Sequence, residues 1–90
     1  MKVEFKSSKK DQYVVYSQEG CSFKMSFEPG DDIMPAIINI PEDHEWVHVT
    51  QTRLSEKHNI LEFIAQEVTE KIAPGGEYQI TSNYIKIFKD

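Results

Sequence analysis

In the N-terminal third of the chain, apolar and polar residues alternate along 2–6 and 22–28, whereas residues 13–16 are apolar on both faces, as in a central strand covered on both sides. A period of two is typical of strands that bury one side. Three strands are therefore predicted, over residues 2–6, 13–16 and 22–28. The polar residues between them, at 7–12 and 18–20, predict the turns that join neighbouring strands.

The next stretch, residues 33–40, is strongly apolar but contains Pro35 and is followed by Pro41. Proline lacks the amide donor of a strand ladder and breaks a helix interior, so neither a regular central strand nor a long helix is expected. The preceding residues 29–32, Pro-Gly-Asp-Asp, predict a turn. We expect 33–40 to form an irregular, extended, edge-like segment packed against the domain.

Residues 46–52 are rich in β-branched and aromatic side chains, which favours a fourth strand. In that strand Val47 and Val49 would face the core, and Trp46 and His48 would lie on the opposite side.

A helix is predicted after this strand, with Ser55 as its N-cap and Glu56 near its positive end. Its apolar residues recur at spacings of three and four and form one stripe. They are Ile60, Leu61, Ile64, Ala65, Val68 and Ile72. The Pro-Gly-Gly sequence at 74–76 ends the helix.

A hairpin is predicted at the C-terminus. Tyr78 and Ile80 alternate in its first strand, Ile85 and Ile87 in its second, and Asn83 is expected to adopt a left-handed conformation between them.

These elements predict one α+β domain over residues 1–90, with an antiparallel sheet of about five to six strands packed on one amphipathic helix. The order is β-β-β, the irregular apolar segment, then β-α-β-β. The helix stripe would pack against apolar side chains of the sheet. These are Phe23, Met25, Phe27, Val47, Val49, Ile80, Ile85 and Ile87.

Composition narrows the classes of partner. The formal net charge of −5 disfavours nucleic acid, whose phosphates are bound by clustered cations. Cys21 is the only cysteine, so it has no disulfide partner within the chain, and its surroundings predict an inert thiol. No signal-peptide pattern or long apolar span is found. A cytoplasmic protein without cofactor or membrane contact is therefore expected.

One motif suggests chemistry. His44-Glu45-Trp46-Val47-His48 resembles the H-E-x-x-H sequence of zinc metallopeptidases over these five residues. That resemblance implies His44 and His48 as zinc ligands and Glu45 as general base. The two imidazoles can share an ion only on a helix, whereas in a strand they would lie about 13 Å apart. Because a strand is predicted, we interpret the motif as a chance match and keep a small zinc hydrolase as the alternative.

The leading functional hypothesis concerns the second face of the sheet. One helix cannot cover both faces, so Trp46, His48, Tyr84, Lys86 and Phe88 are predicted to form an aromatic surface. Either residues 33–40 fold across this surface, or it binds a protein partner or a second copy of the chain. We expect a non-enzymatic interaction or regulatory module, of which a homodimer is one form.

Overall fold

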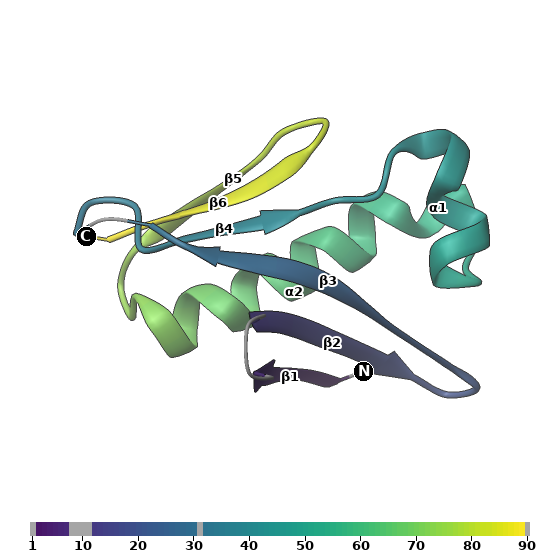
Figure 1. Cartoon of the computed structure of the whole chain (residues 1–90), viewed down its shortest axis with the longest axis horizontal. Coiled ribbons are helices and arrows are strands. Elements are labelled where there is room, and N and C mark those ends of the chain that lie inside the picture. The colour runs from purple at the N-terminus through teal and green to yellow at the C-terminus, as the bar shows by residue number, and fades with distance from the viewer. Residues whose placement is uncertain (1, 8–11, 31, 90) are drawn as a thin grey trace.

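Six strands form one antiparallel sheet in the computed structural model, which describes residues 2–7, 12–30 and 32–89. The elements in chain order are β1 (Lys2–Ser7), β2 (Gln12–Gln18), β3 (Cys21–Pro29), β4 (Ala36–Asn39), α1 (Asp43–Thr50), the 3₁₀ turn η1 (Leu54–Glu56), α2 (Lys57–Ile72), β5 (Glu77–Ile80) and β6 (Tyr84–Phe88). Their spatial order is β1-β2-β3-β4-β6-β5 (Figure 1). The predicted α+β class, with an antiparallel sheet of this size and a long helix, is confirmed.

β1 and β3 follow the predicted alternation, and β2 buries Val14 and Tyr16 on one face while Tyr13 and Val15 are half-buried on the other. β1 pairs with β2, and β2 pairs with β3 through a tight hairpin in which Gln18 lies opposite Cys21. Gly20 in that turn has φ of +77°, a conformation that costs glycine little. The predicted turn at 7–12 falls mainly on residues 8–11, which lie outside the described residues.

β4 corrects the prediction of an edge-like segment at 33–40. Residues 36–39 are extended, but they pair with β3 on one side and β6 on the other, so β4 lies inside the sheet. The two prolines flank this short strand and therefore remove none of its ladder donors. Residues 36–39 consequently do not fold across the second face of the sheet.

α1 contradicts the strand predicted at 46–52. As a helix, the segment buries Trp46 and Thr50, which lie one turn apart, and leaves Val47 and Val49 exposed. The prediction that the two valines face the core is therefore wrong. Asp43 and Glu45 occupy the first turn, where the helix dipole favours negative charge. Burial of the indole has overridden the β propensity of the neighbouring residues.

Trp46 connects α1 to the rest of the domain. Its side chain is 0% exposed and meets the Phe23 ring edge to face, with the centroids 5.7 Å apart. The indole N–H donates to the backbone oxygen of Arg53 at 3.2 Å. The Lys57 ammonium lies 5.4 Å from the indole centroid and 2.6 Å from an oxygen of Asp43. One aromatic side chain thus joins α1, β3 and the start of α2.

α2 carries the predicted stripe toward the sheet. Five of its six members are buried, and Ile72 is half-buried against the core. Ser55 is not the N-cap, because it lies inside η1 and α2 begins at Lys57. The helix ends at Ile72, one residue short of the predicted Pro-Gly-Gly stop at 74–76.

The C-terminal hairpin pairs β5 with β6, as predicted. Asn83 is not left-handed, since Gln51 is the one non-glycine residue of the described part of the chain with positive φ. A side chain at Gly76 would place its Cβ 2.2 Å from the Phe88 oxygen and 2.9 Å from that of Ala73. Glycine is therefore required where the connection from α2 enters β5.

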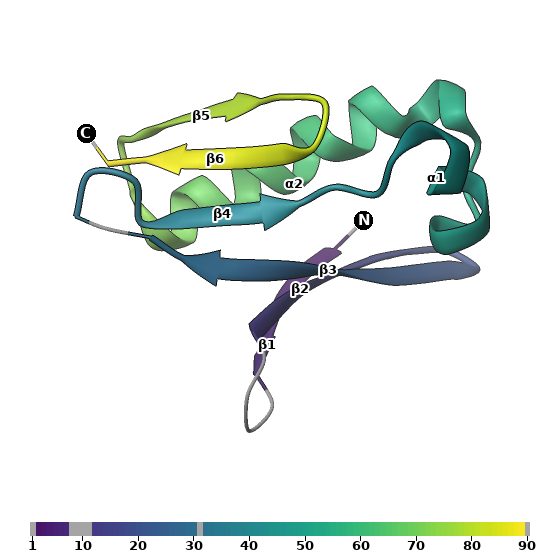
Figure 2. The ribbon, with the colours of Figure 1, turned by 45° about the horizontal axis from the view of Figure 1, so that its top comes forward.

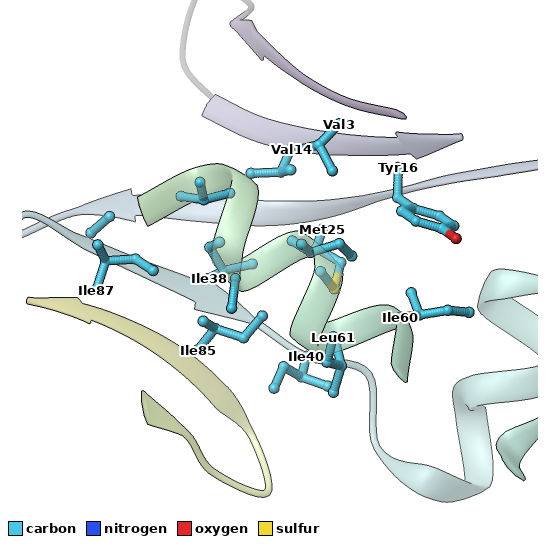
Figure 3. Packing of buried hydrophobic residues seen from close by; sticks show 14 of the residues in the cluster. Val3, Val14, Tyr16, Met25, Ile38, Ile40, Ile60, Leu61, Ile85 and Ile87 are labelled. Carbon is cyan, nitrogen blue, oxygen red and sulfur yellow. The ribbon is translucent and has the colours of Figure 1, made fainter. Parts of the chain in front are cut away.

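The core lies between one face of the sheet and α2. Figure 3 shows side chains from the strands, such as Val14, Met25, Ile38 and Ile85, directed toward Leu61 and its neighbours on α2. In Figure 2, α2 passes behind the sheet, and no helix of the described residues covers the face turned to the viewer. None of the helices in the described ranges combines the length and apolar character that crossing a membrane requires.

The helical placement of Trp46 generates the first prediction. Trp46→Ala is expected to lower the free energy of unfolding by about 3–5 kcal/mol because it empties a fully buried site. Val47→Ala, the matched control at a side chain that is 55% exposed, should change it by about 0.5 kcal/mol or less. Urea unfolding of the two variants measures the difference, and a larger loss at Val47 would contradict the placement.

Gln51 supplies a second prediction. It ends α1 with φ of 60°, a region that costs a residue with a Cβ about 1–2 kcal/mol. After the greater entropy of glycine in the unfolded chain is subtracted, Gln51→Gly should raise stability by about 0.5–1 kcal/mol. Gln66→Gly on the exposed side of α2 should instead lower it by about 1 kcal/mol. Thermal unfolding distinguishes the two, and destabilisation by both substitutions would be inconsistent with strain at Gln51.

Candidate functional site

The uncovered side of the sheet, here called the open sheet face, contains three of the predicted surface residues. On β6, Ile85 and Ile87 point into the core, so Tyr84, Lys86 and Phe88 point the other way. Tyr84 is 41% exposed, and Lys86 and Phe88 are half-buried. The structure therefore brings these three side chains to one surface.

Neighbouring strands extend this surface. On β4, Ile37 lies opposite Lys86 and Asn39 lies opposite Tyr84. Asn39 donates a 2.7 Å hydrogen bond to the Ser26 hydroxyl on β3. The surface around β6 thus combines aromatic and aliphatic groups with a few polar groups that already have partners.

The charges of the open sheet face are nearly balanced. Strand alternation and register place four lysines and three glutamates on it, namely Lys2, Lys6, Lys24, Lys86, Glu4, Glu28 and Glu77. Glu4 lies 3.4 Å from the Lys2 ammonium and 3.8 Å from that of Lys6. The helical segment 42–72, by contrast, holds seven acidic residues against three basic ones. The acidity of the chain is therefore concentrated on its helical side.

The other two predicted surface residues lie elsewhere. Trp46 is buried beneath α1, so its assignment to an exposed aromatic face is wrong. His48 is exposed, but on α1 and not on the sheet. Both residues leave the predicted surface because 43–50 is a helix. On a strand the side chains of Trp46 and His48 would share one face, whereas on a helix they point to different sides of the axis.

The H-E-x-x-H residues do lie on a helix, which corrects the extended backbone predicted for them. His44, Glu45 and His48 are all exposed. The His44 Nδ1 atom lies 3.3 Å from a Glu42 oxygen, and its Nε2 atom lies 3.4 Å from a Glu45 oxygen.

Side-chain geometry groups Glu42, His44 and Glu45, whose potential ligand atoms lie within 4.8 Å of one another. His48 is not part of this cluster. The motif glutamate contacts the first histidine instead of standing free as a general base. A zinc ion shared by His44 and His48 would need a different orientation of the His44 ring and a third protein ligand.

A cleft of about 520 Å³ opens between the start of α1, the start of α2 and the β5–β6 turn. Leu54 and Leu61 supply apolar lining, and polar groups from both helices and the turn complete it. The Lys57 ammonium in this cleft already contacts Asp43 and the Pro41 oxygen. Sequence reasoning missed the cleft because it forms only when the turn at 81–83 meets the helices.

A second groove, of about 530 Å³, lies between β5 and the C-terminal half of α2. Tyr78 donates a hydrogen bond to Glu62 across this region, and that bond raises the pKa of the phenol above its usual value. We call this second groove the β5 groove. Its lining residues are Gln66, Thr69, Glu70, Gly75, Gly76, Glu77 and Tyr78. No sequence signal located this groove, because β5 becomes an edge only through the strand order of the assembled sheet.

Cys21 is partly buried, and its thiol lies 2.9 Å from the Thr50 oxygen. This contact joins the end of α1 to β3. The thiol has a packing and hydrogen-bonding role in the structure.

Comparisons with protein-family models, with curated proteins and with solved structures give no significant match to this chain. The surfaces described above therefore carry the assignment of function.

Proposed function

We propose that this chain is a non-enzymatic protein-interaction module that forms a homodimer through the open sheet face. The observation that carries the proposal is a six-stranded sheet with one face packed on α2 and the other free of any helix from the described residues. Tyr84, Phe88 and Ile37 lie on that free face. Aromatic side chains surrounded by a rim of polar residues contribute most of the binding energy of protein interfaces.

Charge favours a second copy as the occupant. A two-fold interface brings the same surface of both subunits together, so a strongly charged surface would repel itself. With four lysines against three glutamates, the open sheet face can meet its own copy with opposite charges paired. The helical side, with its excess of acidic residues, cannot do so without repulsion.

The size of the chain also supports dimerisation. A domain of 90 residues buries a smaller share of its surface on folding than larger domains do. Stable interfaces bury about 800 Å² on each partner, which is roughly one seventh of the 5927 Å² accessible surface of this chain. Two sheets packed face to face, about 10 Å apart, form such an interface.

The proposal includes a cytosolic location and excludes nucleic acid as the partner. The single cysteine suits a reducing compartment. The open sheet face carries lysines, but Glu4 lies beside two of them, Lys2 and Lys6, which weakens their attraction for phosphate.

The zinc hydrolase is the alternative function. The helical backbone of α1 favours this alternative, because the motif requires a helix and the sequence had predicted an extended backbone. The side chains favour the non-enzymatic proposal. His44 is held between two carboxylates, and neither motif histidine lines the cleft or the β5 groove.

Tyr84→Lys tests the dimer. It adds a charge within the proposed contact, and we expect the dimer dissociation constant to rise at least about tenfold. Val47→Lys, at an exposed position on α1, is the matched control and should leave that constant unchanged. Sedimentation equilibrium measures the mass against the 10.5 kDa of one chain. A wild-type chain that stays monomeric at high micromolar concentration would refute the proposal.

Zinc titration tests the alternative. We expect calorimetry with zinc chloride to show no stoichiometric site, because the ligand atoms of His44 face Glu42 and Glu45 and not a position shared with His48. His48→Ala should therefore leave the weak binding isotherm unchanged. Tight binding at one zinc per chain that this substitution abolishes would instead support the hydrolase.

A further inference from the structure

β5 is the edge strand at the end of the sheet opposite β1, and its outward backbone groups have no strand partner among the described residues. The Thr81 amide donates to the Tyr84 oxygen at 2.8 Å, which marks this pair as hydrogen-bonded. In an antiparallel ladder such pairs alternate, so Gln79 bonds Lys86 and Glu77 bonds Phe88. The amides and carbonyls of Tyr78 and Ile80 therefore point away from β6, to the outside of the sheet.

The two edges of the sheet differ in protection. β1 carries Lys2 and Lys6, and lysines on an edge strand discourage pairing with another chain. β5, Glu77-Tyr78-Gln79-Ile80, has no lysine and no proline. Of the two edges, β5 is the one suited to receive an additional strand.

The β5 groove provides space for the side chains of such a strand. It runs beside β5 and is bounded by Gln66, Thr69 and Glu70 of α2, with a volume of about 530 Å³. Because side chains of a strand alternate, every second residue of an added strand would face this groove. The volume is sufficient for long side chains.

Charge identifies the kind of side chain. Glu70 and Glu77 line the groove, and none of its described lining residues is basic. Neither carboxylate has a salt bridge among the described residues, and both residues are exposed. These two negative charges would attract lysine or arginine side chains of the incoming strand.

We propose that the β5 edge binds an extended, basic segment of another protein as a seventh strand, with lysine or arginine side chains in the β5 groove beside Glu70 and Glu77. Main-chain hydrogen bonds to Tyr78 and Ile80 hold the segment, and the groove selects its charge. Apart from Glu77, which strand alternation also assigns to the open sheet face, the site lies outside that face, and it goes beyond the proposed dimer.

The probe is a ten-residue peptide of alternating lysine and threonine, with both ends blocked, titrated into the full-length chain. Amide spectra should show saturable shifts, and hydrogen exchange at the amides of Tyr78 and Ile80 should slow by about tenfold. Exchange at Gln79 should change little, because its amide is already bonded to β6. The same peptide with glutamate in place of lysine should not bind.

Protein variants test the charge selection. Glu70→Gln together with Glu77→Gln should weaken peptide binding by about tenfold. Glu19→Gln together with Asp32→Asn removes the same charge from exposed positions outside the groove and outside the open sheet face, and should weaken peptide binding far less. Tyr84→Lys, which disrupts the proposed dimer, should bind the peptide as the wild type does, so the two proposals can fail separately.

Three outcomes of the peptide experiments would overturn the inference, and a fourth outcome would do so without peptide. The three are the absence of binding, binding without protection of Tyr78 and Ile80, and equal losses in the two double variants. Protection of Tyr78 and Ile80 that appears without peptide and grows with protein concentration would also overturn it, because a second copy would then occupy the edge.

Discussion

The fold depends on the burial of one face of a six-stranded sheet beneath a single long helix. α2 has 16 residues and is therefore about 24 Å long, which is enough to cross the sheet once. Its apolar stripe and the inward side chains of all six strands exclude water together. No second long helix exists among the described residues, so the opposite face and the outer edge of β5 stay accessible. The surfaces proposed for binding are direct consequences of this two-layer design.

Trp46 completes the core at the end that α2 leaves incomplete. The indole packs on Phe23, and α1 places it there by forming a short helix in place of a strand. The adjoining Thr50 hydroxyl donates to the Trp46 oxygen, and the Cys21 thiol contacts the Thr50 oxygen. These contacts hold α1 against β3 and leave its outer side, with His44 and His48, in solvent. The same packing that stabilises α1 thus keeps His44, Glu45 and His48 exposed to solvent.

Charge divides the molecule into two sides with different expected partners. The open sheet face is nearly neutral and suits contact with its own copy, whereas the β5 groove lies at the acidic helical side and suits a basic segment. The two surfaces share Glu77 at the start of β5 but neither Tyr84 nor Glu70, so substitutions at Tyr84 and at Glu70 each act on one surface. A module of this kind would present two peptide-binding edges on one dimer.

The sequence by itself determined those helices and strands whose apolar pattern is compatible with only one type of secondary structure. The stripe of α2, the alternation of β3 and the β5–β6 hairpin were predicted because each pattern buries its apolar side in one conformation.

Tertiary structure decided the conformation of residues 36–39 and 43–50. A strand of 43–50 would expose either the valines or the tryptophan. As a helix the segment buries the large indole of Trp46 against Phe23, which is more favourable than burying the smaller Val47 and Val49. Likewise, only the space between β3 and β6 draws Ala36–Asn39 into the sheet, since four residues between two prolines carry too little local information to choose a partner. The β6 part of the binding surface followed from local alternation, whereas the β5 groove arises from strand order, a property of the assembled sheet.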